Sequence, residues 1–323
     1  MDNERLKQGA RKLVEVNGRA IAEDQILVIT DYTMQGMAEY IIDAARATGA
    51  EVVTCIMPPR ERDGQEPPAA VAAAMIEATL LFSPVRRSIT HTRAMRAALD
   101  SGARAILMTA YTEELLTSPA LLETDFSAQA EVCVRIGDAF TQGDRVKLTS
   151  PRGTELTFSI AGRQANVLTN IPEPGQLAPV PDIEVNVVPV TGSAQGLLIA
   201  DASVPYLGIG VLDEPITCHI EDGYITKIEG GEQARVLKED LDSHDDRHCF
   251  NIAELGVGLN PNARLNGTML DDEGVMGTIH IGIGTSHTLG GEVVAPTHYD
   301  LIMWAPEIEV DGMVIQRDKE ILV

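Results

Sequence analysis

The sequence predicts an α/β protein, α+β overall, with an N-terminal parallel-sheet domain of βαβ units followed by a β-rich domain. Two observations predict this class. Over the first 115 or so residues, short apolar runs alternate with stretches of helical periodicity. After about residue 126, the pattern changes to short alternating segments separated by turn residues. We therefore place a domain boundary near residue 125, which gives domains of residues 1–125 and 126–323.

The first domain alternates expected strands and helices in a regular order. The expected strands are apolar and β-branched, at 25–30, 51–57, 79–84 and 103–109. The expected helices lie between them, at 34–50, 69–78 and 90–102. Strands that recur about every 25 residues with helices between them predict a parallel sheet. No GxGxxG or GxxxxGK[ST] motif follows the first strand, which argues against a dinucleotide or P-loop site.

The second domain consists mainly of expected strands with Gly- and Pro-containing turns. These strands are expected within 131–140, 144–150, 155–162, 184–189, 196–201, 216–223 and 224–231. A helix or turn over 242–250 precedes a Gly-rich segment, and 277–303 is dense in glycine and apolar residues. We expect this half to carry the chemistry, because five of the seven histidines lie between 244 and 298.

Composition excludes several classes of function. The formal net charge is −23, and so acidic a surface repels phosphate backbones and anionic lipid, which argues against nucleic-acid or membrane binding. No run reaches the roughly 20 apolar residues of a membrane span, and the charged N-terminus lacks a signal-peptide core. The four cysteines are scattered without a CxxC pair, as expected for reduced thiols. We expect a cytoplasmic protein that acts on a small molecule.

Four residues are candidate metal ligands. In THYDLIMW (297–304), His298 and Asp300 are two positions apart, so on a strand both side chains point to one side. His280 and Glu254 lie in similarly apolar segments, TIHIGIGTS and NIAELGVGLN. Buried charge is costly unless it is paired or bound to metal, although a hydrogen-bonded His–Asp pair is an alternative. Two carboxylates and two imidazoles suit zinc, manganese, cobalt or ferrous iron.

Other polar residues fit less specific roles. His244 and His248 are four apart amid charges, which is more typical of a solvated face than of a metal pair. Glu173 lies in a rigid Pro- and Gly-containing turn, NIPEPGQLAPVP (170–181). It is either a surface acid or a positioned acid–base catalyst.

Taken in order, these segments resemble the aminopeptidase T family of metallopeptidases. The resemblance covers residues 165–305 and implies that Glu254, His280, His298 and Asp300 are metal ligands and that the chain is a homodimer. Where those peptidases have a glutamate in the first turn, this chain offers Gln176 or the displaced Glu173.

The chain also resembles the 2,5-dihydroxypyridine 5,6-dioxygenases, through its length and its Glu173-Pro174-Gly175 turn. That family holds one ferrous iron with two histidines and an aspartate. His298 and Asp300 match two of these ligands, while the other histidine falls at Glu254.

Three functions follow as expectations. The first is a metal-dependent hydrolase acting on an amide, lactam or N-heterocyclic small molecule, with Glu173 as acid–base group. The second is an Fe(II)-dependent ring-cleaving dioxygenase. The third is a non-catalytic relative that keeps the metal for structure.

Overall fold

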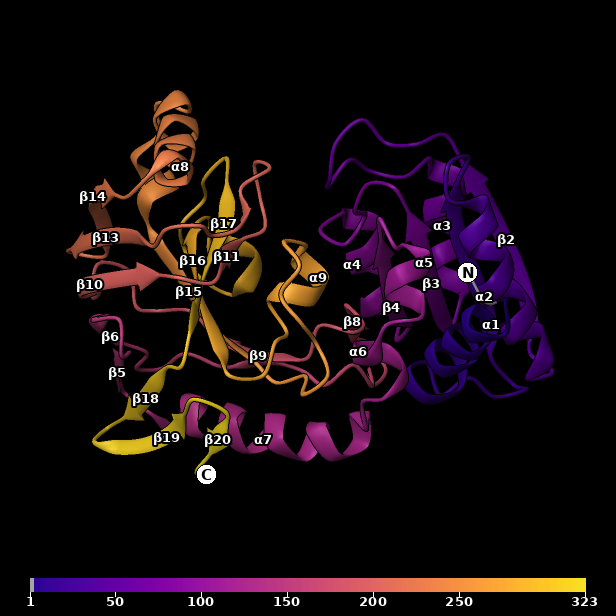
Figure 1. Ribbon diagram of the computed structural model, residues 1–323. Helices are drawn as coiled ribbons and strands as arrows, with labels where there is room; N and C mark the ends of the chain where they lie inside the picture. Colours follow the sequence, from indigo (N-terminus) through magenta and orange to yellow (C-terminus); the bar gives the residue numbers. More distant parts are fainter. Residues whose placement is uncertain (1–2) are drawn as a thin grey trace. The chain divides into compact units, whose positions relative to one another are not determined.

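The computed structural model describes residues 3–323, and these form two compact units. The first unit comprises the chain up to Ala130 together with Leu168–Pro181, and the second comprises Glu131–Val167 and Asp182–Val323. The first contains a parallel sheet and the second is mostly antiparallel sheet (Figure 1), so the predicted fold class is confirmed.

The first unit is a parallel five-stranded sheet with the order β2-β1-β3-β4-β8. Its strands are β1 (Gln25–Asp31), β2 (Glu51–Met57), β3 (Leu80–Val85), β4 (Arg104–Thr109) and β8 (Leu177–Ala178). Its helices are α1 (Asn3–Arg11), the π-helix η1 (Lys12–Asn17), α2 (Gln35–Ala47), α3 (Ala69–Glu77), α4 (Arg93–Asp100), α5 (Glu113–Leu116) and α6 (Pro119–Leu122). The alternation of strand and helix therefore follows the predicted order.

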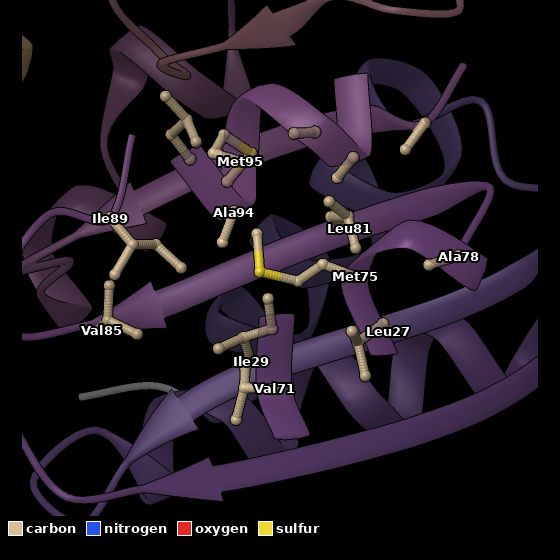
Figure 2. Packing of buried hydrophobic residues seen from close by; sticks show 14 of the residues in the cluster. Leu27, Ile29, Val71, Met75, Ala78, Leu81, Val85, Ile89, Ala94 and Met95 are labelled. Atoms are coloured by element: carbon tan, nitrogen blue, oxygen red, sulfur yellow. The ribbon is translucent and has the colours of Figure 1, made fainter. Parts of the chain in front are cut away.

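A hydrophobic core fills the space between this sheet and helices α3 and α4. Leu27, Ile29 and Leu81 come from the strands, and Met75 and Met95 come from the helices (Figure 2). Strand β3 is buried at every position, as a central strand of a parallel sheet should be. Helix α4 begins where the Thr92 side chain accepts a hydrogen bond from the Met95 amide, which satisfies one of the free N–H groups of the first turn.

The second unit contains two sheets. One has eight strands in the order β14-β13-β10-β6-β5-β18-β19-β20. These are β5 (Arg145–Thr149), β6 (Glu155–Ser159), β10 (Gln195–Ala200), β13 (Ile216–Glu221), β14 (Tyr224–Glu229), β18 (Glu307–Val310), β19 (Met313–Arg317) and β20 (Glu320–Ile321). The other has seven strands in the order β12-β11-β17-β16-β15-β9-β7. These are β7 (Asn166–Leu168), β9 (Glu184–Val187), β11 (Ser203–Val204), β12 (Gly210–Val211), β15 (Ile252–Gly258), β16 (Thr278–Gly284) and β17 (His298–Trp304).

Short helices connect these strands. They are α8 (Glu232–Ser243), η2 (Arg247–Phe250), α9 (Met269–Asp272) and η3 (His287–Leu289). Helix α7 (Phe126–Gln142) begins in the first unit and continues into the second. The strand expected at 131–140 is wrong, because this segment belongs to α7. Cys133, Ile136 and Phe140 are buried at helical spacing, whereas Val134, which fits a strand pattern, is 51% exposed.

No helix among the described residues is both long and apolar enough to cross a membrane.

Candidate metal centre

The centre of the seven-stranded sheet gathers polar side chains on one of its faces. Antiparallel pairing sets Glu254 on β15 and Asp300 on β17 opposite Gly282 on β16, and it sets His280 opposite Gly256. Directly paired residues point to the same face of a sheet. The next pairs along, Gly284 with His298 and Gly258 with Glu184, continue the same face. The register thus brings together side chains that are more than a hundred residues apart in sequence.

Each of these side chains lies opposite a glycine on the neighbouring strand, and the lack of a Cβ on that glycine leaves space for the side chain. A Cβ on Gly256 would lie 1.9 Å from His280 Nε2. A Cβ on Gly282 would lie 2.8 Å from the Cβ of Glu254 and 2.9 Å from His298 Nε2. The glycines of these strands therefore form a cradle for the ligand side chains.

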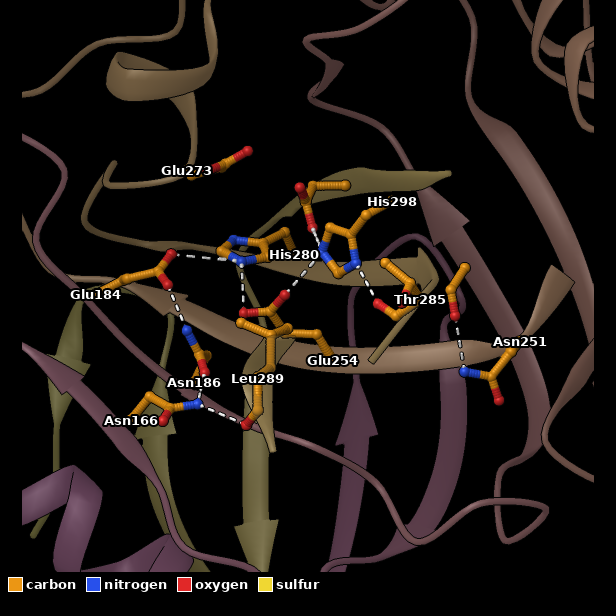
Figure 3. A network of polar contacts seen from close by, with 12 residues as sticks. Asn166, Glu184, Asn186, Asn251, Glu254, Glu273, His280, Thr285, Leu289 and His298 are labelled. Atoms are coloured by element: carbon orange, nitrogen blue, oxygen red, sulfur yellow. Dashed lines mark hydrogen bonds and ion pairs between the residues drawn. The ribbon is translucent and has the colours of Figure 1, made fainter. Parts of the chain in front are cut away.

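Glu254 lies between the two histidines (Figure 3). Its Oε2 is 3.0 Å from His298 Nε2, and its Oε1 is 3.8 Å from His280 Nε2. A second carboxylate approaches each Nε2 atom: Glu184 Oε2 is 3.5 Å from that of His280, and Asp300 Oδ1 is 3.5 Å from that of His298. Except for His298, these side chains are almost completely buried.

Three overlapping groups have the ligand types and spacing of a metal site. Glu184, Glu254 and His280 form one, and Glu254, His298 and Asp300 form the second. Within each group the ligand atoms lie within 4.8 Å of one another. The third group is Asp182, Glu184 and Glu273. Glu254 belongs to two of these groups, with Oε1 toward His280 and Oε2 toward His298.

A shell of hydrogen bonds orients the ligands. His298 Nδ1 is 2.7 Å from the Thr285 carbonyl oxygen, which accepts a hydrogen bond from Nδ1–H and leaves Nε2 as the ring nitrogen that faces the cluster. The Tyr206 hydroxyl donates to Asp300 Oδ2 over 2.7 Å and is 3.0 Å from Glu273 Oε1. On the other side, Asn186 donates to Glu184 Oε1 over 2.5 Å.

The pKa values of the carboxylates shift in opposite directions, because burial and like charges raise them and contacts with the histidines lower them. Burial, with the charge of Glu184, raises the pKa of Asp182, and burial raises the pKa of Glu184 to about 7. Burial opposes ionisation of Glu254 and Asp300 too, but contacts with the histidines lower the pKa of each.

The histidines are shifted toward the protonated form. Burial alone would lower the pKa of His280, but its contact with Glu254 and the charges of Glu184 and Asp300 raise it to about 10. The same opposition raises the pKa of His298, with Asp300 as the main charged neighbour. The carboxylates therefore stabilise the protonated histidines, and a metal ion that binds here competes with those protons.

The residues fit a divalent metal. Five buried carboxylates face two imidazoles, and such an excess of negative charge in a protein interior is costly without a cation. Asp300 Oδ1 is buried without a hydrogen-bond partner among residues 3–323 and is directed toward His298 Nε2. Oxygen and imidazole donors suit zinc, manganese, cobalt or ferrous iron. The cluster is therefore a candidate site for a divalent metal.

The structure brings Glu254, His280, His298 and Asp300 together, as the sequence suggested. It adds Glu184, Asp182 and Glu273, which sequence reasoning missed. Glu184 had a usable signal, because it is an acid within the apolar run DIEVNVV, just as Glu254 is within NIAELGVG. The ligand position that the resemblance left to Gln176 or Glu173 thus has a candidate in Glu184.

Glu173 lies in the first unit and is exposed. Its carboxylate is 2.7 Å from Arg19 Nη2, and its backbone amide donates a hydrogen bond to Gln176 Oε1. The acid–base role of Glu173 stays a prediction. His244 and His248 lie outside the cluster and are close to Asp240 and Asp246.

Comparisons with known proteins identify the family. A family model described as 2,5-dihydroxypyridine 5,6-dioxygenase (NicX) matches residues 14–322. The 2,5-dihydroxypyridine 5,6-dioxygenase of Pseudomonas putida KT2440 is 28% identical over 153 residues, which are 44% of this chain and 44% of that protein. The aligned part thus spans less than half the length of that curated relative.

Two solved structures share the fold. The 2,5-dihydroxypyridine dioxygenase of Pseudomonas putida KT2440 superposes with a TM-score of 0.85 at 20% identity, covering 100% of this chain and 98% of that chain. Wild-type AmpT, the aminopeptidase T of Thermus thermophilus, superposes with a TM-score of 0.68 at 16% identity, covering 99% of both chains. Both resemblances predicted from the motifs are confirmed, and at these identities the structural likeness establishes the fold.

Proposed function

The chain belongs to the 2,5-dihydroxypyridine 5,6-dioxygenase (NicX) family, and from its ligand set we propose that it is a metal-dependent hydrolase within this family. The substrate class is a small amide, lactam or N-heterocycle. The family description, which refers to a pyridine ring, supports a small nitrogen-containing ring over a free peptide.

The observation that carries the proposal is the position of Glu254 in two ligand groups. Glu184, His280 and one oxygen of Glu254 would hold one cation, and His298, Asp300 and the other oxygen would hold a second. A carboxylate shared by two adjacent cations is suited to two-metal hydrolysis, in which the attacking and leaving groups are held together. Bound divalent metal supplies the polarisation of a carbonyl and lowers the pKa of a water molecule toward neutrality.

The protein groups do the positioning. The Thr285 carbonyl fixes the ring of His298, and the Tyr206 hydroxyl fixes the carboxylate of Asp300. Because the face of the sheet that carries the ligands is buried, these contacts act in a low-dielectric environment where electrostatic interactions are strong.

An Fe(II)-dependent dioxygenase is the second candidate, and the family match favours it. Ferrous oxygenases typically use two histidines and one carboxylate around a single ion. In this chain the group that contains His298 and Asp300 is completed by Glu254, which gives one histidine and two carboxylates. His280 belongs to the other group. The ligand types therefore favour hydrolysis.

The test combines metal analysis with oxygen measurement. Protein purified without added metal is assayed with small amides, lactams and dihydroxypyridines, in air and under anaerobic conditions. We expect metal-dependent turnover that is equal in both conditions and takes up no oxygen. Oxygen uptake that matches the loss of a dihydroxypyridine, with ferrous iron required, would instead establish the dioxygenase.

Variants locate the activity. Glu254→Ala, His280→Ala and His298→Ala should each lower turnover by at least about a hundredfold, because each removes a ligand. His219→Ala is the matched control, because His219 is an exposed histidine of the same unit that pairs with Glu229. Glu173→Gln should lower kcat while metal content stays unchanged if Glu173 acts as the acid–base group.

A further inference from the structure

A chain of amide side chains extends from Glu184 to the loop that follows β16. Asn186 Nδ2 donates to Glu184 Oε1 over 2.5 Å, and Asn166 Nδ2 donates to Asn186 Oδ1 over 2.8 Å. The same Asn166 nitrogen donates to the Leu289 carbonyl over 3.1 Å. Figure 3 shows these residues joined by dashed lines, from Leu289 through Asn166 and Asn186 to Glu184.

The Leu289 carbonyl, at one end of this row of hydrogen bonds, fixes the direction of each of them. The Leu289 carbonyl can only accept, so Asn166 must direct its NH₂ group toward it. Asn166 then also donates to Asn186 Oδ1, which leaves the NH₂ group of Asn186 facing Glu184. A backbone carbonyl outside the metal centre therefore determines which atom of Asn186 meets the carboxylate.

The consequence for Glu184 is a fixed rotation of its carboxylate. Oε1 accepts from Asn186, so Oε2 is the oxygen that lies toward His280, 3.5 Å from Nε2. Asn186 is 2% exposed and lies on the same strand as Glu184, so no water competes easily for this contact.

This row of hydrogen bonds, a relay from Leu289 to Glu184, ends at a ligand of the group formed by Glu184, His280 and Glu254 and not of the group formed by Glu254, His298 and Asp300. His298 is held by the Thr285 carbonyl and Asp300 by Tyr206, and neither contact involves an asparagine. We propose that Asn186 and Asn166 are positioning residues that orient Glu184 and thereby set the affinity of the group formed by Glu184, His280 and Glu254 for a divalent cation. This inference rests on the metal centre of the proposed function.

The test is a titration of the full chain, stripped of metal by a chelator, with Co(II) or Zn(II). Binding is followed by calorimetry and, for cobalt, by the visible absorption of the bound ion. We expect the wild type to bind two equivalents. Asn186→Ala should weaken one equivalent by about 10–100-fold and change the other by less than about threefold. Asn166→Ala should weaken the same equivalent by a smaller factor.

A double variant distinguishes a relay from general damage. Because Asn166 acts through Asn186, the Asn166→Ala, Asn186→Ala double variant should weaken that equivalent no more than Asn186→Ala alone. Asn251→Ala is the matched control, because Asn251 is equally buried in this unit but donates to the Gly284 carbonyl. It should leave both affinities unchanged. If Asn186→Ala does not fold, Asn166→Ala carries the test, since Asn166 is only partly buried.

Two results would overturn the proposal while leaving the metal centre in place. These are unchanged affinities in both single variants, or an equal loss at both equivalents. A wild-type chain that binds neither Co(II) nor Zn(II) would instead overturn the proposed function itself.

Discussion

At the scale of single residues, the metal centre depends on glycines, which have no Cβ, as well as on the side chains that could bind metal. Gly256 and Gly282 lie directly opposite ligand-bearing positions on neighbouring strands. Glycine within a strand weakens it, because it adds backbone entropy and no packing. Here the absence of a Cβ leaves space for the His280 imidazole beside Gly256 and for Glu254 beside Gly282.

Gly256→Ala tests this space. The new methyl group would overlap His280 Nε2, so the ring must move away from Glu184 and Glu254. We expect metal affinity to fall by at least about tenfold and the free energy of unfolding by about 1–3 kcal/mol. Gly36→Ala is the control, because nothing lies within 4 Å of its added Cβ, and it should change stability by less than about 0.5 kcal/mol. Unaltered metal binding in Gly256→Ala would show that His280 does not need the space that Gly256 leaves.

Tyr206→Phe tests the hydroxyl that contacts Asp300. The substitution keeps the ring and removes the hydrogen bonds to Asp300 and Glu273. We expect metal affinity to fall by about 10–100-fold, because an unsupported ligand loses its orientation. Tyr299→Phe is the matched control: its ring lies 5.2 Å from that of Tyr206, but its hydroxyl donates to Asp240. Equal effects of the two variants would assign the loss to packing alone.

The ligands found from sequence and those missed differ in context. His298 and Asp300 are recognisable because two polar groups on one side of an apolar strand need an explanation. Glu273 and Asp182 lie next to a turn and a proline, where acidic residues are ordinary, so their burial follows only from the tertiary fold. Tyr206 lies in a loop, and no local pattern indicates that its hydroxyl reaches β17.

At the scale of elements, strands with one dominant pattern were predictable. Strand β2 has the predicted bounds, and β1, β3 and β4 differ from prediction by a residue or two, because apolar β-branched runs end sharply at turn residues. The strand expected at 131–140 lies instead within α7. Its valines at 132 and 134 alternate with polar residues, and only packing shows that the helical stripe of Cys133, Ile136 and Phe140 is the buried one.

A buried ion pair ties β4 to the turn before β1. Arg104 Nη2 contacts both oxygens of Asp24 at 2.7 and 2.9 Å, and Asp24 also accepts from the Thr79 hydroxyl. We expect Arg104→Leu to destabilise the chain by about 3–5 kcal/mol, because it leaves a buried carboxylate unpaired. Arg93→Ala, which removes an ion pair with an almost fully exposed arginine, should cost less than about 1 kcal/mol. Denaturant unfolding at pH 7 measures both.

The same pair predicts a dependence on pH. Burial opposes ionisation of Asp24, but hydrogen bonds from Thr79, Ile21 and Arg104 lower its pKa overall. A lowered pKa in the folded state gives stability that is present above the ordinary value of about 3.9. That stability is lost as the pH falls through the lower folded value. The difference in the free energy of unfolding between wild type and Arg104→Leu should therefore shrink below pH 4. A difference that stays constant would show that the charge of Asp24 is not what Arg104 stabilises.

At the scale of the whole molecule, acidic residues outnumber basic residues, and several of the acidic residues are buried. The chain has 48 acidic and 25 basic residues, and five of the acidic residues lie in the buried cluster. A cation bound at this cluster should therefore stabilise the protein, because a ligand that binds only the folded state stabilises it.

Removal of metal should selectively destabilise the second unit. At a free metal concentration of 100 times Kd, each bound cation contributes about 2.7 kcal/mol. We expect a chelator to lower the melting temperature of the β-rich unit by several degrees and to leave that of the parallel-sheet unit unchanged, as calorimetry or hydrogen exchange can show. Equal loss of protection in both units would place the bound metal elsewhere.

Metal binding should also release protons. In the absence of metal, His280 has a pKa of about 10 and is protonated at pH 7, so a cation must displace that proton. Metal affinity should consequently rise with pH through the neutral range. Calorimetry in buffers of different ionisation enthalpy measures the number of protons released per cation, and a value of zero would contradict the assignment of His280 as a ligand.

The return of Leu168–Pro181 to the first unit has a consequence for how this protein can be divided. The polypeptide passes from one unit to the other three times, and β8 within the returning segment completes the edge of the parallel sheet next to β4. Neither unit is encoded by one uninterrupted stretch. A fragment cut near residue 130 would have a sheet without its last strand, so no single cut separates the two units intact.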